Sequence, residues 1–186
     1  ANLVSYTVLG HENEIREYST IHRSIQAGGE TRLGNKNFLM ALSHVAHDCI
    51  VGNQVVIANQ SILAGHVTVG DRAFISGLSG AHQYTRIGTL AMISGLTRVT
   101  KDAPPYMIYE GESFVMGVNV VGLRRAGVSA ATRTALTRAY RVVFRSGLSV
   151  PNALQALRLE WEGREMPPEL QHFIEFCAVK SKRGLG

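Results

Sequence analysis

An aliphatic residue recurs at every sixth position through most of the first hundred residues. From Leu3 to Val99, fifteen of the seventeen residues at this spacing are Leu, Ile or Val, and the other two are Ala27 and Ala81. A six-residue period matches neither the turn of an α-helix, about 3.6 residues, nor the alternation of a simple strand. It is typical of a solenoid of short parallel strands, in which three hexads make one triangular turn and the aliphatic side chains stack inside. We therefore predict a mainly β fold, a parallel β-helix.

Small residues mark the corners of this predicted solenoid. Glycine falls every eighteen residues, at Gly34, Gly52, Gly70 and Gly88, where a tight corner favours it. Segment 23–32 keeps the period only through Ala27, so we expect it to loop out. This is the hexapeptide repeat, whose coil is left-handed in the families that share it. Since the pattern is already under way at Leu3, we also expect N-terminal coils that are missing from this sequence.

The six-residue period ends near the pair Pro104-Pro105, and helical spacing takes over. Apolar residues at helical intervals predict amphipathic helices over Ser129–Arg145, Pro151–Arg164 and Pro168–Lys182, with Ser129 as an N-cap. We predict two parts, the β-helix over residues 1–110 and a small α-helical C-terminal domain over residues 111–186.

Composition limits the class of protein. Hydrophobic residues make up 45% and charged residues 18% of the chain, which is typical of a folded protein and excludes disorder as the main state. Apolar runs are too short to cross a bilayer and no export signal is visible, so we expect a cytoplasmic protein without a transmembrane segment. Two cysteines, Cys49 and Cys177, cannot form a disulfide framework.

Positive charge is concentrated at the C-terminus. Residues 124–186 hold 11 Lys and Arg against 5 Asp and Glu, which favours an acidic partner. The aromatic residues of this segment stand at helical core spacing and form no stacking platform, so we expect no nucleic-acid partner.

The repeat also gathers the histidines. Counted modulo eighteen, His82, His47 and His66 fall at adjacent phases in three successive turns, which predicts that they line one edge of the solenoid, with His44 nearby. Two chemistries use such a column. Convergent imidazoles can bind zinc, whereas acyl transfer needs one histidine as a general base, a carboxylate to orient it and a backbone N–H to receive an oxyanion. The pair His47-Asp48 with Gly65 supplies the second set.

Six runs of residues resemble one family over nearly the whole chain. They are Ile15-Arg-Glu-Tyr-Ser-Thr-Ile-His-Arg23, His44-Val-Ala-His-Asp-Cys49, Leu63-Ala-Gly-His66, Ala81-His-Gln-Tyr84, Ala103-Pro-Pro-Tyr106 and Asn119-Val-Val-Gly-Leu-Arg-Arg125. The chain resembles the acyl-[acyl-carrier-protein]–UDP-N-acetylglucosamine O-acyltransferases, hexapeptide-repeat enzymes that carry out the first step of lipid A biosynthesis.

The resemblance implies a role for each matching residue. His47 matches the general base that takes the proton of the glucosamine 3-hydroxyl, Asp48 matches its associated carboxylate, and the N–H of Gly65 matches the oxyanion donor. Gly95 matches the position that limits acyl-chain length. The resemblance further implies residues that line the substrate cleft, namely His22, His44, His66, His82 and Gln83, and residues that hold the nucleotide, namely Asn119 and Arg125.

The resemblance also implies the partners. These are UDP-N-acetylglucosamine, a 3-hydroxyacyl-[acyl carrier protein] that the basic residues Arg133, Arg138, Arg141 and Arg145 would face, and two further copies of the chain in a homotrimer. It implies no metal, no other cofactor and no covalent enzyme intermediate. Three alternatives stay open: an N-acyltransferase acting on a UDP-amino sugar, a zinc-dependent hydratase like the carbonic anhydrases of this fold, and a non-catalytic trimeric scaffold.

Overall fold

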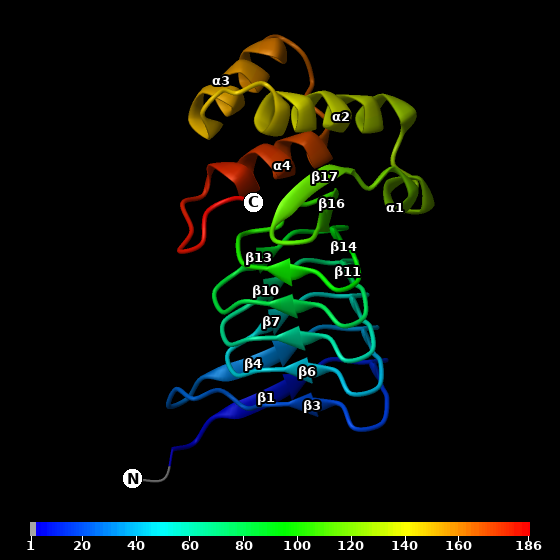
Figure 1. Cartoon of the computed structure of the whole chain (residues 1–186), viewed down its shortest axis with the longest axis vertical. Coiled ribbons are helices and arrows are strands. Elements are labelled where there is room, and N and C mark those ends of the chain that lie inside the picture. The colour runs from blue at the N-terminus through cyan, green and yellow to red at the C-terminus, as the bar shows by residue number, and fades with distance from the viewer. Residues whose placement is uncertain (1–2) are drawn as a thin grey trace.

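The computed structural model describes residues 3–186, which form a parallel β-helix with helices at its C-terminal end (Figure 1). Strands of mostly two residues pair in parallel with strands one turn away and build three sheets. Sheet A contains β1 (Tyr6–Leu9), β4 (Glu30–Leu33), β7 (Ile50–Val51), β10 (Thr68–Val69) and β13 (Arg86–Ile87). Sheet B contains β2 (Glu14–Ile15), β5 (Phe38–Leu39), β8 (Val56–Ile57), β11 (Phe74–Ile75), β14 (Met92–Ile93), β16 (Met107–Glu110) and β17 (Phe114–Val118). Sheet C contains β3 (Thr20–Ile21), β6 (His44–Val45), β9 (Ile62–Leu63), β12 (Gly80–Ala81) and β15 (Arg98–Val99).

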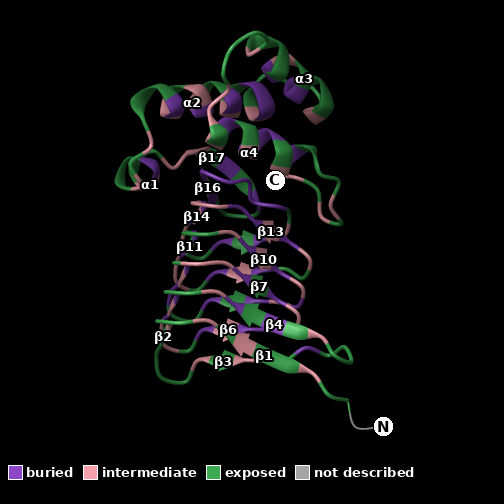
Figure 2. Cartoon of the chain, turned by 180° about the vertical axis from the view of Figure 1, so that it is seen from behind, coloured by how far each residue is buried: buried purple, intermediate pink, exposed green. Residues whose placement is uncertain are grey.

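The hexad side chains fill the inside of the solenoid, as the repeat predicts. From Leu33 to Val99 every one of them is buried, and Leu39, Val45, Ile57, Leu63 and Ile93 are fully inaccessible. The first coil differs, since Leu9 and Ile15 remain 45% and 41% exposed. Among residues 3–186, this coil packs against a neighbouring coil on one side only, and Figure 2 shows its surface largely as exposed residues.

The chain loops out of the coil between β3 and β4, as expected, but the loop ends at Gly29, because residues 30–32 belong to β4. Tyr6 pairs with Glu30, 24 residues further on, whereas Arg32 pairs with Ile50, 18 residues further on. The extra six residues lie between β3 and β4. Ala27 is exposed, so the added hexad leaves the core and loops over the surface.

The C-terminal part begins with a hairpin. Strand β17 pairs antiparallel with β16 at the end of sheet B, so residues 114–118, which we expected to lie in a helical segment, extend the sheet. Four helices follow: α1 (Val120–Arg125), α2 (Ala130–Arg145), α3 (Val150–Glu160) and α4 (Pro168–Ala178). Helices α2, α3 and α4 cover the C-terminal end of the solenoid, and α1 lies beside its last coils (Figure 1).

A side-chain cap marks the start of α2, and changes of backbone conformation mark the ends of α3 and α4. The Ser129 side chain accepts a hydrogen bond from the Thr132 N–H, so the predicted N-cap of α2 is confirmed. Helix α3 ends four residues earlier than predicted, before a turn in which Gly163 adopts a positive φ of 72°. Helix α4 ends at Ala178 because the chain becomes extended at Val179. Within residues 3–186, no helix has the length and apolar character needed to cross a membrane.

A buried ion pair fastens the C-terminal helices to the solenoid. Asp102 is fully buried and accepts hydrogen bonds from the backbone N–H of Arg86 at 2.9 Å and from its Nε at 2.8 Å. The same guanidinium donates to the carbonyls of Phe176 and Val179 at the end of α4, both at 3.2 Å. One arginine thereby joins sheet A to α4 and places positive charge at the helix C-terminus, where it is favourable.

We predict that Arg86→Ala lowers the free energy of unfolding by about 3–5 kcal/mol, because it leaves the Asp102 carboxylate buried without its charged partner. Denaturant unfolding measures this loss. Arg98→Ala is the matched control, since Arg98 lies on sheet C in an exposed ion pair with Glu112, and such pairs contribute less than about 1 kcal/mol. Equal losses in the two variants would contradict the prediction.

Candidate active site

One corner of the solenoid, where each turn passes from sheet C to sheet A, carries the predicted histidines. His47, His66 and His82 follow β6, β9 and β12 in three successive turns, as the repeat predicts. Equivalent residues of successive turns lie over one another at this corner, so that Asp48, His66 and Tyr84 form one stack. All three adopt positive φ, between 60° and 66°, which turns the chain sharply and directs these side chains outward along the same edge.

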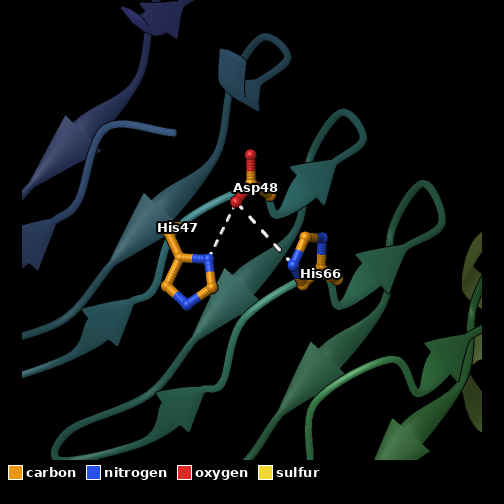
Figure 3. A group of neighbouring side chains, drawn as sticks. All are labelled: His47, Asp48 and His66. Atoms are coloured by element: carbon orange, nitrogen blue, oxygen red, sulfur yellow. Dashed lines mark hydrogen bonds and ion pairs between the residues drawn. The ribbon is translucent and has the colours of Figure 1, made fainter. Parts of the chain in front are cut away.

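The carboxylate of Asp48 lies between two imidazoles (Figure 3). Its Oδ2 is 2.8 Å from Nδ1 of His47 and 3.8 Å from Nε2 of His66. The first distance is a hydrogen bond and the second is an electrostatic contact only. The two rings meet edge to face with centroids 5.2 Å apart. A carboxylate at Nδ1 keeps the proton of a neutral His47 on that nitrogen and leaves Nε2 as the free acceptor.

The loop of residues 23–29 supplies further donors to Asp48. The Ser24 hydroxyl, itself buried, donates to Oδ1, and the N–H of Ile25 approaches Oδ2 at 3.5 Å. Burial alone would raise the pKa of Asp48, but the hydrogen bonds from Ser24, His47 and Ile25 hold that pKa below its ordinary value. Asp48 therefore stays ionised at neutral pH, as a partner of a histidine base must.

Gly65 provides the space that the His47 ring occupies. A Cβ at Gly65 would stand 2.4 Å from Cε1 and 2.7 Å from Nε2 of His47, closer than atoms can approach. Within residues 3–186, no acceptor is recorded for the Gly65 N–H. A free acceptor nitrogen and a free amide donor thus stand side by side at the same corner.

His22 and His44 form a second pair of histidines, beside the group of His47, Asp48 and His66. Their rings meet edge to face at 4.6 Å, and the Thr20 hydroxyl lies 2.8 Å from Nδ1 of His44. Burial, and then the charge of His22, lower the pKa of His44, so this imidazole is neutral at neutral pH. His22 and His47 both line an open groove of about 530 Å³, which makes His22 a neighbour of the predicted base.

His82 and Gln83 lie at the upper end of the same corner and are exposed. They contact the end of the chain, because Nε of Arg183 donates to the carbonyl of Gln83 at 2.8 Å and its Nη2 donates to Nδ1 of His82. Tyr84 stacks on His66, with ring centroids 4.6 Å apart and an angle of 6° between the planes.

The remaining predicted residues lie on other faces of the chain. Gly95 is at the corner between β14 and β15. Asn119 and Arg125 border a separate hollow of about 640 Å³ whose floor includes Phe74 and Met92 of sheet B. The Asn119 side chain is engaged internally, since Oδ1 accepts from the Gly122 N–H and Nδ2 donates to the Leu90 carbonyl, both at 2.9 Å. A single chain therefore does not bring these residues to His47.

The Cys49 thiol and most of the four arginines expected to face a partner are engaged within the chain, which limits their reactivity or their contact with a partner. Cys49 adjoins Asp48, but burial raises the pKa of its thiol to about 11, so it stays protonated at neutral pH and is a poor nucleophile. Three of the four arginines expected to face a partner have internal partners: Arg138 pairs with Glu160, Arg145 bonds Tyr140, and Arg133 bonds the Val128 carbonyl. Arg141 is exposed.

Sequence reasoning missed four residues at this corner, namely Ser24, Tyr84, Lys182 and Arg183. Tyr84 was within reach, because it stands eighteen residues after His66. Ser24 lies in the loop that interrupts the period, and the two cations lie in the C-terminal segment, so no spacing signal connects these three to the histidines.

We predict that Ser24→Ala raises the pKa of Asp48, because it removes the largest of the favourable contacts of that carboxylate. A carboxylate whose pKa is lowered on folding stabilises the fold above its unfolded pKa, and the contribution is lost as pH falls through the folded-state value. As the pH falls, Ser24→Ala should thus begin to lose this stability at a higher pH than the wild type does. NMR titration of the Asp48 carboxyl carbon, with acid unfolding alongside, measures both effects.

Ser19→Ala is the matched control for this variant. The Ser19 hydroxyl lies on the same coil but bonds the Met40 carbonyl, at 3.0 Å, and the Ser43 hydroxyl. Ser19→Ala should leave the Asp48 titration unchanged. If Ser24→Ala also leaves it unchanged, the Ser24 hydroxyl is not what lowers the pKa of Asp48.

Two family models match the chain. Residues 102–186 match a model described as UDP N-acetylglucosamine O-acyltransferase, domain 2. Residues 30–65 match the bacterial transferase hexapeptide model of six repeats.

Relatives with known names match almost the whole chain. It is 44% identical to the acyl-[acyl-carrier-protein]–UDP-N-acetylglucosamine O-acyltransferase of Synechocystis, over 95% of this chain but only 63% of that protein. The protein of the same name from Alkalilimnicola ehrlichii is 44% identical over 95% of this chain and 68% of its own length. The structure of UDP-N-acetylglucosamine O-acyltransferase from Moraxella catarrhalis matches with a TM-score of 0.91 and 42% identity, covering 100% of this chain and 71% of that one. The chain, which spans less than two thirds of the Synechocystis protein, thus belongs to the family of acyl-[acyl-carrier-protein]–UDP-N-acetylglucosamine O-acyltransferases.

Proposed function

We propose that this chain, in a homotrimer, transfers a 3-hydroxyacyl group from acyl carrier protein to the 3-hydroxyl of UDP-N-acetylglucosamine, the first step of lipid A biosynthesis, in the cytoplasm. The hydrogen bond between His47 and the ionised Asp48, which leaves Nε2 of His47 free beside Gly65, carries this proposal. The names of the relatives supply the substrate class.

The reaction follows from these groups. Nε2 of His47 accepts the proton of the sugar 3-hydroxyl as that oxygen attacks the thioester carbonyl carbon. The carbonyl oxygen becomes an oxyanion, which the N–H of Gly65 stabilises as a hydrogen-bond donor. The carbon–sulfur bond then breaks, and the leaving thiolate of the carrier's pantetheine arm takes the proton from His47. The ester is formed and the base is regenerated, without a covalent enzyme intermediate.

Asp48 supports the base in two ways. Its carboxylate holds the imidazole in the tautomer and orientation that expose Nε2, and it stabilises the imidazolium that exists while His47 carries the substrate proton. Contacts from Ser24 and Ile25 keep Asp48 charged, so both effects are available at neutral pH.

The arrangement of residues on separate faces supports a homotrimer. Arg125 and Asn119 border a hollow on sheet B, away from the groove that His22 and His47 line. A neighbouring copy that laid this hollow against the histidine corner would complete one site from two chains. Exposed leucines at the corner between sheets B and C fit such a contact: Leu42 is 50%, Leu78 57% and Leu96 76% exposed.

A zinc-dependent hydratase is the second candidate, and one observation favours it. The ligand atoms of His47, Asp48 and His66 lie within 4.8 Å of one another, a spacing that suits one divalent cation bound by two imidazoles and a carboxylate. Binding through Nδ1 of His47 would replace its hydrogen bond to Asp48. Transfer activity that persists with a strong chelator favours the acyltransferase, whereas stoichiometric zinc and no transfer favour the hydratase.

Acceptor preference and ligand binding distinguish the other two alternatives, an N-acyltransferase and a non-catalytic scaffold, from the proposed function. An N-acyltransferase would prefer an acceptor with an amine in place of the 3-hydroxyl. A scaffold without a sugar site would show no rise in melting temperature with UDP-N-acetylglucosamine, because a ligand stabilises only a fold that binds it.

We predict that His47→Ala lowers the transfer rate by about 10²–10⁴-fold, the usual contribution of a general base. The assay measures transfer from 3-hydroxymyristoyl carrier protein to UDP-N-acetylglucosamine. Gly65→Ala should lower the rate about 100-fold with the fold intact, since its Cβ displaces the imidazole. If His47→Ala transfers at the wild-type rate, the proposed mechanism is wrong. If the wild type itself is inactive, the proposal that this chain is an acyltransferase is wrong.

We predict that the double variant Leu78→Asp, Leu96→Asp reduces the mass in solution from three chains to one, because it buries charge in an apolar contact. Native mass spectrometry or sedimentation measures this. Leu159→Asp is the control: Leu159 is 60% exposed on α3, away from this corner. A double variant that remains trimeric would exclude this corner as the contact between copies.

A further inference from the structure

The C-terminal segment, residues 179–186, returns to the solenoid beside the histidine corner. After α4 it turns back toward sheet A (Figure 1). Backbone contacts seat it, since the Asp102 N–H donates to the Gly184 carbonyl at 2.7 Å and the Gly186 N–H donates to the Asp102 carbonyl at 3.2 Å. The Ser181 hydroxyl accepts from the N–H groups of Arg183 and Gly184. None of these contacts uses a cationic side chain, so all of them remain when the charge of Lys182 or Arg183 is removed.

Arg183 fixes the state of His82. A guanidinium has only donors and stays charged, so its contact with Nδ1 of His82 requires that nitrogen to be the acceptor. The proton of the neutral ring must then be on Nε2. The Gln83 carbonyl also lies 3.4 Å from Nδ1, which is long for a hydrogen bond, whereas it accepts from Nε of Arg183 at 2.8 Å. Arg183 thus holds His82 with a single Nε2–H donor directed away from the segment.

Lys182 acts on the next histidine through an aromatic ring. Its Nζ lies 3.7 Å from the centroid of the Tyr84 ring, a favourable cation–π contact. Tyr84 in turn stacks face to face on His66, at 4.6 Å, and His66 faces Asp48. The lysine thereby covers the outer end of a stack whose inner end is the carboxylate paired with His47.

We propose that Lys182 and Arg183 are positioning residues of the acyltransferase site: Arg183 sets the tautomer and orientation of His82, and Lys182 holds His66 in place through Tyr84. This inference rests on the proposed function, because it concerns how the site is organised for transfer. His82 is exposed, and without Arg183 its ring is free to rotate and to exchange tautomers. A donor fixed before the substrate arrives binds it with less loss of conformational freedom.

The test compares single replacements by methionine, which keep a long side chain and remove the charge. Arg183→Met should convert His82 from one tautomer to a mixture, visible in the ¹⁵N shifts of its ring, which His82→Gln assigns. The value of kcat/KM for transfer should fall about tenfold, the effect of one hydrogen bond to a charged group. Lys182→Met should shift the ring signals of His66 and Tyr84 and leave the tautomer of His82 unchanged.

Two further variants separate positioning from general effects. Lys180→Met removes a charge from the same segment, and Lys180 is exposed, with no hydrogen bond or ion pair recorded among residues 3–186; it should match the wild type. Arg183→Lys retains a cationic donor and should restore part of the single-tautomer signal and of the rate. The melting temperature should be the same throughout, because the backbone contacts remain.

The outcomes distinguish this inference from the proposed function. If Arg183→Met keeps one His82 tautomer, or if Lys180→Met loses as much activity as Arg183→Met, the positioning role is overturned while the transfer activity stands. If the wild type transfers no acyl group, the proposed function fails, and the inference that rests on it fails as well, even where the tautomer changes as expected.

Discussion

The stacking of aliphatic side chains at every sixth residue is the interaction on which the rest of this structure depends. Burial of apolar surface is the main favourable contribution to folding, and here each buried residue lies over its equivalent in the coil below. A slip of one residue along a strand would turn these side chains outward, so the register of eighteen residues is strongly enforced. The same register brings outward-facing residues together, which is why Asp48, His66 and Tyr84 share one corner.

The insertion in the first coils shows how a strict repeat accommodates a functional feature. The pairing interval increases from 18 to 24 residues, by one whole hexad, so the phase of the buried side chains is preserved. The inserted residues do not follow the six-residue repeat, and they fold back over the corner between sheets C and A. They bring Ser24 and the N–H of Ile25 to Asp48, and these contacts keep the carboxylate ionised. A loop that adds nothing to the buried hexads thus helps to lower the pKa of the carboxylate in the candidate site.

The end of the chain reaches the same corner through polar contacts. Arg86 and Asp102 join sheet A to α4, and Asp102 also pairs with the segment around Leu185. These contacts carry Lys182 and Arg183 to residues about one hundred positions earlier in the chain. Solenoid and helices are therefore coupled near the histidines, although most contacts within the solenoid join neighbouring coils.

The sequence by itself determined the coil, the buried hexads, the common corner of His47, His66 and His82, and the Ser129 cap of α2, because each depends on a local pattern that repeats or on neighbouring residues. It also carried the motifs of the family. Only the tertiary structure decided that residues 114–118 pair with β16 as a strand, since that requires an open sheet edge. It also decided that the Asn119 side chain is engaged internally and that Gly95 and Arg125 lie away from His47. Periodicity fixes which side chains face the core, whereas contacts between a loop, a C-terminal segment and a solenoid corner depend on packing between elements that share no period.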